Sequence, residues 1–212
     1  MELTEKNYFS PEMNMKYTGS SQIKSFLSCE GKTLAELNGE WEEKTSEPML
    51  VSSFIDESIS ETLEDFKLVH PEIFTQKGEL KAQYRIAEKV LEQIYDDPMF
   101  LKYLSGEHQK IMTGEISGVP VKIKIDSYFE DKLIVDLKAM KDLELIWNNS
   151  TKQKENFIQS YDYILQAALY QEIVRQHTGK QLPFIIAVAI IKFKRKAQSL
   201  HHFYIVLFAN LC

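Results

Sequence analysis

Hydrophobic residues in the first half of the chain recur every three to four positions, the spacing of one face of an α-helix. This pattern predicts helical structure within residues 18–39, over residues 49–66 and 79–95, and as a short turn over residues 100–104. Polar or proline-containing segments separate these stretches. We therefore expect the first half of the chain to be helical.

The pattern changes at Ile111, where apolar and polar residues begin to alternate as they do in a half-buried strand. Turn signals at Ser117–Gly118 and Glu130–Lys132 predict a meander of three strands, near residues 111–116, 119–128 and 133–138. A long helix is expected over residues 154–177, followed by a last strand over residues 184–193. Helices before and after a small central mixed sheet indicate an α/β (α+β) fold.

Charged residues occupy regular positions in the second and third predicted strands. Asp136 and Lys138 are two residues apart, so their side chains project from the same face. If the hairpin folds about residue 131, Asp126 lies opposite Asp136. Like charges opposite each other destabilise a sheet, and a bound divalent cation would remove that conflict. The spacing alone fits a solvated face equally well, but the apolar neighbours favour a functional site because charge there is costly.

The residue types suit one kind of metal chemistry. Two carboxylates, from Asp126 and Asp136, together with the Leu137 carbonyl and waters, suit Mg²⁺, with Mn²⁺ as a substitute. Lys138 would orient a water molecule or stabilise the charge that develops on a phosphate. These residues therefore predict a metal-dependent active site.

Two motifs resemble a known group of nucleases. Asp126, followed ten residues later by Asp136-Leu137-Lys138, resembles the D…(D/E)-x-K motif of the restriction-endonuclease-like PD-(D/E)XK superfamily. Gln166 and Tyr170, four apart on one helical face, resemble the Q-x-x-x-Y motif of its RecB and lambda-exonuclease branch. The amino-acid sequence of residues 106–140 also resembles that of phage and prophage exonucleases related to exodeoxyribonuclease VIII (RecE). The resemblance covers about residues 18–193.

The resemblance implies a fold and an activity. It implies a restriction-endonuclease-like core, and we expect one nuclease domain over residues 18–196, after an N-terminal extension at 1–17 and before an atypical tail at 197–212. The implied activity is a DNA exonuclease that degrades linear duplexes 5′→3′ in phage-type recombination. The implied partners are DNA, further copies of the chain in a ring-like oligomer, and a protein that anneals single strands. Gln166 and Tyr170 would border the active site, although a helix-capping polar pair is the simpler alternative.

Other functions and residues stay open. An endonuclease or an RNA nuclease could use the same fold, as could a non-catalytic DNA-binding or scaffold protein. Asp56 stands where related nucleases often carry a metal-binding histidine, but a solvated helical acid is an equally good interpretation. Glu115 is another candidate outer carboxylate, with a cross-strand pair to Lys122 or Lys124 as the simpler alternative. His201 and His202 are expected to be tail residues rather than ligands, in a segment that is either an additional strand or a divergent C-terminus.

Charge and composition limit how the chain could hold DNA. The 212 residues include 25 Lys and Arg against 31 Asp and Glu, a net charge of −6, which argues against binding through the overall field. A local basic patch is needed instead, and one candidate, also explicable as a solvated strand end, comprises Lys192, Lys194, Arg195 and Lys196. Cys29 and Cys212 form neither a disulfide framework nor a zinc site. Without a signal-like or membrane-spanning stretch, we expect a cytoplasmic protein with no membrane association.

Overall fold

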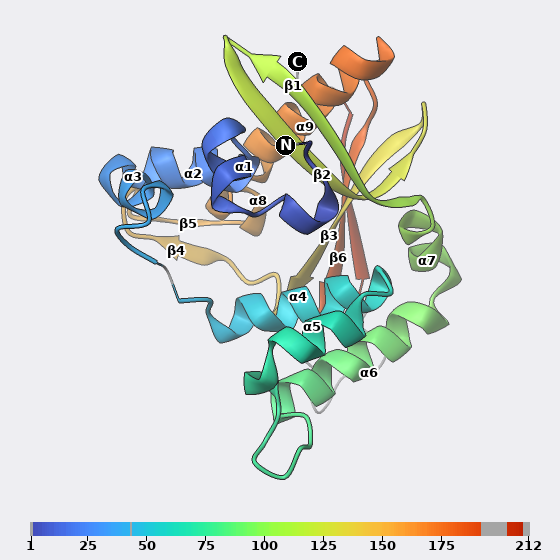
Figure 1. Cartoon of the computed structure of the whole chain (residues 1–212). Coiled ribbons are helices and arrows are strands. Elements are labelled where there is room, and N and C mark those ends of the chain that lie inside the picture. The colour runs from blue at the N-terminus through green and yellow to red at the C-terminus, as the bar shows by residue number, and fades with distance from the viewer. Residues whose placement is uncertain (1, 43, 192–202, 210–212) are drawn as a thin grey trace.

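A five-stranded mixed sheet forms the centre of the computed structural model, which describes residues 2–42, 44–191 and 203–209 (Figure 1). Its spatial order is β1-β2-β3-β6-β7. β3 and β6 run parallel, and the other neighbouring strands are antiparallel. The strands are β1 (Glu107–Ile116), β2 (Val119–Phe129), β3 (Leu133–Met140), β6 (Phe184–Ile190) and β7 (Phe203–Phe208).

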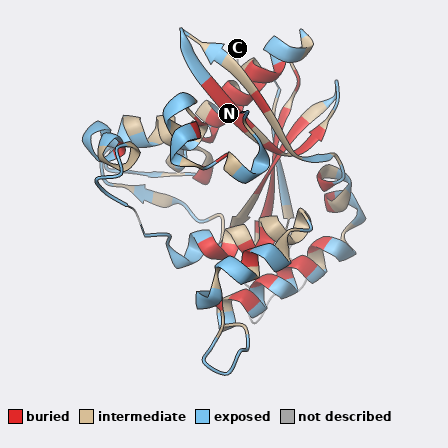
Figure 2. Ribbon diagram, viewed as in Figure 1, coloured by how far each residue is buried: buried red, intermediate tan, exposed pale blue. Residues whose placement is uncertain are grey.

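Helices cover the two faces of this sheet, and each face has its own hydrophobic core (Figures 1 and 2). One face is covered by α4 (Glu47–Ile59), α5 (Leu63–Val69), α6 (Ala82–Asp96) and α7 (Pro98–Leu104). Phe54 and Tyr84 pack there against Val135 of β3. The other face is covered mainly by α9 (Tyr163–Thr178), whose Ile173 packs with Ile123 of β2. The predicted α+β fold with a small mixed sheet is confirmed. None of the helices in the described part of the chain is long and apolar enough to cross a bilayer.

The N-terminal segment is attached to the sheet through β2. It contains η1 (Glu5–Asn7), α1 (Pro11–Lys16), α2 (Ser20–Ser28) and α3 (Glu30–Leu37). Thr18 forms two backbone hydrogen bonds with β2, donating to the Pro120 carbonyl at 2.9 Å and accepting from Lys122 N at 3.1 Å. Met13 of α1 is fully buried. These contacts fix the first helices beside the β1–β2 hairpin (Figure 1).

Two of the predicted helices are wrong in their extent. Residues 49–66 are not one helix, because Glu61 adopts a left-handed φ of 61° between α4 and α5. The predicted helix over residues 154–177 begins too early. Residues 153–155 instead form β5 (Gln153–Glu155), which pairs with β4 (Ile146–Asn148), and α8 (Phe157–Ser160) follows. Asp162, with a φ of 49°, separates α8 from α9.

The hairpin between β2 and β3 has the register expected from the sequence. Ser127 lies opposite Val135 and Phe129 opposite Leu133, so the hairpin is centred on residue 131. Asp131 itself has a left-handed φ of 59°, as a tight turn requires. The last predicted strand ends at Ile190 rather than at residue 193, and residues 192 and 193 lie outside the described residues.

Residues 203–208 of the tail form β7, which pairs with β6. Of the two interpretations offered for the tail, the additional strand is therefore the one observed for these residues. His201 and His202 lie outside the described part of the chain.

Burial of α1 leads to a test with a matched pair of residues. Met13 is 0% exposed, whereas Met15 in the same helix is 63% exposed. Met13→Ala should lower the free energy of unfolding by about 2–4 kcal/mol, the usual cost of truncating a buried methionine. Met15→Ala should change it by less than about 0.5 kcal/mol, as surface substitutions do. Denaturant unfolding of both variants is the measurement, and equal effects would contradict the tight packing of α1.

Candidate active site

The site lies where β2 and β3 separate. Their pairing ends at Ser127 and Val135, whereas β3 stays paired with β6 as far as Met140. Just beyond the last pair, the Leu137 N–H donates a hydrogen bond to Asp126 Oδ2 at 2.8 Å. The Asp126 carboxylate thus accepts a hydrogen bond that a backbone carbonyl would accept in a regular strand pair. Asp126 Oδ1 does not take part in this hydrogen bond.

The alternation of side chains along β2 shifts at the same point. Ile125 and Tyr128 both belong to the core under α9, although they are three residues apart and should face opposite sides. Gln109, the β1 residue between those paired with Ser127 and Ile125, has a left-handed φ of 53° that is unusual within a strand. This local distortion accompanies the turning of Asp126 toward a cavity rather than into either core.

Asp136 is buried and held from two sides. Its Oδ1 accepts a hydrogen bond from Gln166 Nε2 at 2.7 Å. Its Oδ2 lies 2.7 Å from the Lys138 ammonium, but it is buried without a well-directed hydrogen bond. Lys138 Nζ also lies 3.3 Å from the Leu137 carbonyl oxygen. One ammonium therefore faces both β3 oxygens that the sequence suggested as metal ligands.

Three carboxylates share this environment. Burial, and next the charge of Asp136, raises the pKa of Asp126 to about 6. Burial, and next the charge of Asp126, raises the pKa of Asp56 well above its usual value, while Lys138 opposes the shift. Burial alone would lower the pKa of Lys138, but Asp136 and Asp126 together raise it above its ordinary value. Asp56 is thus part of the site rather than a solvated helical acid.

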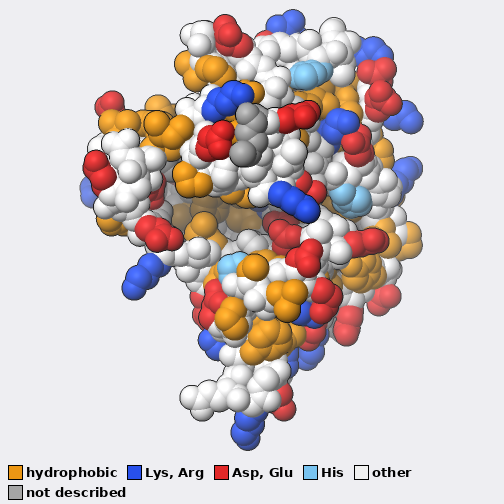
Figure 3. Space-filling model, in the orientation of Figure 1, with side chains coloured by type: hydrophobic (Ala, Val, Ile, Leu, Met, Phe, Trp, Pro, Cys, Tyr) orange, Lys and Arg blue, Asp and Glu red, His pale blue; other side chains and the backbone are white. Residues whose placement is uncertain are grey.

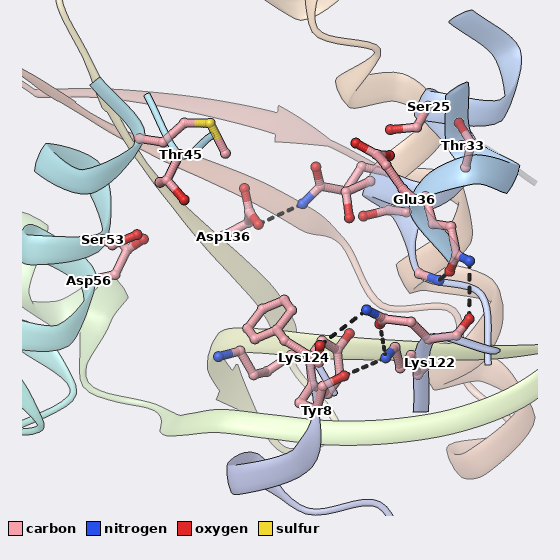
Figure 4. Close-up of a pocket in the computed structure, with 18 of the residues that line it drawn as sticks. Tyr8, Ser25, Thr33, Glu36, Thr45, Ser53, Asp56, Lys122, Lys124 and Asp136 are labelled. Atoms are coloured by element: carbon pink, nitrogen blue, oxygen red, sulfur yellow. Dashed lines mark hydrogen bonds between the residues drawn. The ribbon is translucent and has the colours of Figure 1, made fainter. Parts of the chain in front are cut away.

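These residues line a cavity of about 850 Å³ between the N-terminal segment, α4, β2, β3 and α9. Figure 4 shows Ser53 and Asp56 extending from α4 on one side of it, and Asp136 near its middle. Figure 3 shows the corresponding face of the molecule hollowed between the N-terminal helices and the α4–α5 region. The cavity is open to a ligand at the carboxylates.

Gln166 and Tyr170 both line the same cavity. The Tyr170 hydroxyl donates to the Lys124 carbonyl at 3.0 Å, which links α9 to β2. Gln166 reaches Asp136 instead of a free backbone group at a helix end. The alternative interpretation, a helix-capping pair, therefore does not describe these two side chains.

Lys24 of α2 is a further member of the site that the sequence did not reveal. Its Nζ donates to Gln166 Oε1 at 3.2 Å and to the Tyr161 carbonyl at 2.7 Å. Since Lys24 has only donors, it fixes the Gln166 amide so that the Nε2 group faces Asp136. Burial, and next the charge of Lys138, lowers the pKa of Lys24 to about 8. Nothing in the local sequence of α2 distinguishes this lysine from a surface lysine.

Two further lysines bring positive charge to the cavity, beside its carboxylates. Lys122 and Lys124 line it from β2. Lys122 Nζ donates to Asn14 Oδ1 at 2.7 Å and to the Tyr8 carbonyl, and burial lowers its pKa to about 8. In the sequence, the alternation of these lysines with apolar residues was the feature that could have indicated their position in the site. The other basic candidate, Lys192, Lys194, Arg195 and Lys196, lies outside the described residues.

Glu115 does not belong to the site. It is exposed, its cross-strand neighbour is Pro120, and it does not line the cavity. It also does not pair with Lys122, which contacts Asn14 and Tyr8 instead. Glu115 follows the strand toward the Ser117–Gly118 turn, away from the point where β2 and β3 separate, so the structure does not bring this candidate ligand to the other carboxylates.

The donor atoms fit a hard cation. Asp56, Asp126, Asp136 and the Leu137 carbonyl offer only oxygen, the ligand that Mg²⁺ and Mn²⁺ prefer. One buried Asp136 oxygen lacks a directed hydrogen bond, and the pKa values of Asp56 and Asp126 are raised first by burial and next by a neighbouring carboxylate, so a cation would stabilise the ionised groups. Among the described residues, no three His, Cys, Asp or Glu side chains are grouped as a ready-made metal site. Waters and the carbonyl would therefore complete the coordination of any ion.

Comparison with known proteins agrees with this geometry. Residues 19–201 match the family described as a PDDEXK-like domain of unknown function (DUF3799). The chain belongs to this family. A solved structure from Eubacterium rectale, described as a "putative exonuclease", is similar with 41% sequence identity and a TM-score of 0.88. The similarity covers 99% of this chain and 78% of that one. No curated protein matches the sequence.

The assignment to the PD-(D/E)XK superfamily and the restriction-endonuclease-like fold are thus confirmed. The family and the similar structure support a nuclease, and PDDEXK nucleases generally use divalent metal ions.

The raised pKa of Asp126 predicts how stability depends on pH in the metal-free protein. Because the folded protein holds this proton more tightly than the unfolded chain, raising the pH from about 4 to about 6 should cost stability. Two pKa units set an upper limit of about 3 kcal/mol. Asp126→Asn should therefore flatten the fall, measured by denaturant unfolding in EDTA between pH 4 and 7.

Asp131→Asn is the matched control on the same hairpin, since its carboxylate is exposed and lies outside the cavity. It should leave the pH dependence close to that of the unaltered protein. An Asp126→Asn profile that overlays the unaltered protein would show that this carboxyl group does not titrate in the expected range.

Proposed function

We propose that this protein is a divalent-metal-dependent DNA exonuclease that hydrolyses phosphodiester bonds at the ends of linear double-stranded DNA. The observation behind the proposal is that Asp126, Asp136 and Lys138 meet at one cavity in a PDDEXK-like chain. A non-catalytic DNA-binding protein would gain nothing from burying three carboxylates around one lysine, since each charge costs free energy to desolvate.

Asp126, Asp136 and the Leu137 carbonyl would hold Mg²⁺, with Mn²⁺ as a substitute and Asp56 as an additional ligand. Such an ion neutralises charge on the phosphate and lowers the pKa of water. The Lys138 ammonium contacts Asp136 Oδ2 and faces the Leu137 oxygen in the structure. It would have to move away from these oxygens when the ion binds, and the open side is the cavity.

Each neighbouring residue then has a role in the same reaction. Lys138, once directed into the cavity, orients the attacking water and stabilises the charge that develops on the phosphate. Gln166 holds Asp136 through its amide, and Tyr170 holds β2 against α9. Lys122 and Lys124 supply a local positive field for the DNA backbone.

The finer parts of the proposal come from the resemblance to RecE-related exonucleases. They are Mg²⁺ as the physiological ion, 5′→3′ polarity with 5′-phosphate products, a ring-like oligomer, a single-strand-annealing partner, and a cytoplasmic role in phage-type recombination. The description of the similar Eubacterium rectale protein supports the exonuclease part.

The direct test compares end-labelled linear DNA with closed circular DNA, each with and without Mg²⁺ or Mn²⁺. An exonuclease degrades the linear form only, and only with metal. Cleavage of the circle would show an endonuclease, and preference for RNA would show an RNA nuclease. A chain that binds no metal and cuts no DNA over a range of ion concentrations would be a binding or scaffold protein.

Substitutions at the site should separate catalysis from metal binding. Lys138→Ala should reduce cleavage about 10²–10³-fold, the usual loss for one catalytic electrostatic contact, and should keep metal binding because an ammonium is not a ligand. Asp136→Ala and Asp126→Ala should lose both, because each removes an anionic oxygen. Calorimetric titration with Mn²⁺ beside a nuclease assay measures the two effects.

Lys110→Ala is the matched control, because this lysine pairs with Glu107 at the surface and does not line the cavity. It should cleave like the unaltered protein. If Lys138→Ala kept normal cleavage, the catalytic role given to this lysine would be wrong.

A further inference from the structure

A second cavity, of about 900 Å³, adjoins the first one at Asp56 and Lys138. The two cavities share Met49, Ser53, Asp56 and Lys138 in their linings, so the active-site lysine lies at their junction. A substrate that reaches Lys138 through one cavity can therefore continue into the other.

The lining of the second cavity differs from that of the first. Part of its lining is apolar or aromatic, including Leu145, Ile146, Tyr161 and Tyr163, and another part is acidic, with Glu47, Asp142 and Glu144. Leu145 is 59% exposed and Tyr161 is 48% exposed. Such exposure next to an active site is costly unless a ligand covers it.

Two tyrosines connect this lining to the catalytic lysine. The Tyr163 ring centroid lies 5.7 Å from Lys138 Nζ and 5.8 Å from the Tyr161 ring centroid. Tyr163 is buried between Lys138 and Tyr161, whereas the Tyr161 side chain is partly exposed to solvent. The Tyr161 backbone is fixed on both sides, since its N–H donates to Phe157 O at 3.1 Å and its carbonyl accepts from Lys24. The backbone that carries the ring is thus held in place before any ligand arrives.

A nucleobase is the ligand that this arrangement fits. The phosphate to be cleaved would lie at Lys138, and the adjoining nucleotide's base would extend into the neighbouring cavity. An aromatic ring with one free face stacks on any base, because every base has a π-face. Leu145 and Met49, both largely exposed, would cover the edges of the base.

We propose that the second cavity is a nucleobase subsite, in which Tyr161 stacks on the base of the nucleotide next to the cleaved phosphodiester bond. This inference rests on the proposed nuclease function. It adds a contact that is independent of base identity and keeps the strand from sliding past Lys138.

The test is a double-mutant cycle between the tyrosine and the base. DNA with a recessed or single-stranded end would carry 2-aminopurine, or an abasic sugar, at successive positions from that end. Binding would be measured with Ca²⁺, after confirming on a gel that the DNA stays intact. Unaltered protein should quench 2-aminopurine at one position, and an abasic sugar there should weaken binding about ten- to hundredfold.

Tyr161→Ala should lose the quenching, bind normal DNA about ten- to hundredfold more weakly, and become insensitive to the abasic sugar. Tyr161→Phe should restore all three properties, since the ring remains. Trp147→Ala is the control, because this aromatic residue is similarly exposed (53%) but does not line the cavity. It should behave like the unaltered protein, and circular dichroism checks the fold of each variant.

Two results would overturn the inference in different ways. If Tyr161→Ala kept the quenching and the sensitivity to the abasic sugar while the protein still cleaved DNA, the subsite would be wrong and the nuclease function would stand. If the unaltered protein neither bound nor cleaved DNA, the proposed function would fail, and this subsite would fail with it.

Discussion

The separation of β2 from β3 is the feature on which the rest of the site depends. Strand pairing normally satisfies backbone N–H groups, and a buried N–H without a partner costs free energy. The Asp126 carboxylate meets that need for Leu137, so the strands can part without leaving this donor unpaired. The gap opens beside a strand that is otherwise buried on both faces, and Asp136 and Lys138 are thereby exposed to a cavity rather than enclosed in a core.

The charged groups around this gap are only partly balanced. Lys138 is the cation closest to Asp136, and Gln166 contributes a neutral donor whose direction is fixed by Lys24. Burial, and next the charge of Asp136, raises the pKa of Asp126, and the charge of Lys138 offsets this rise only in part. A divalent ion would do so more completely, and it would release the ammonium to act on a substrate. The same imbalance that lowers the stability of the metal-free protein therefore favours metal binding.

Much of the site could be predicted from the sequence, because its residues are placed by short-range patterns within single strands, one hairpin and one helix. Strand alternation placed Asp136 beside Lys138, the hairpin centre placed Asp126 near them, and helical spacing placed Gln166 beside Tyr170. Lys24 and the buried N-terminal helix were missed because their roles depend on contacts between distant segments. The predicted helix over residues 154–177 was wrong since periodicity cannot show a left-handed residue such as Asp162. Whether Asp56 lies near the other carboxylates could be decided only from the position of α4 beside the separated strands β2 and β3.

The distribution of charge also bears on how such a protein would engage DNA. A chain with a net charge of −6 does not attract a duplex along its whole surface, because phosphate attraction needs concentrated Lys and Arg. In the described part of the chain, Lys122, Lys124 and Lys138 converge inside the cavity, with Lys24 behind them. Asp56, Asp126 and Asp136 line the same cavity, so a cation bound by these carboxylates would be needed before the lysines could attract a DNA strand there. A free end can enter such a cavity, whereas the middle of a closed duplex would first have to open. On the proposed function, the shape of the cavity would favour action at DNA ends, and it would do so without recognising a base sequence.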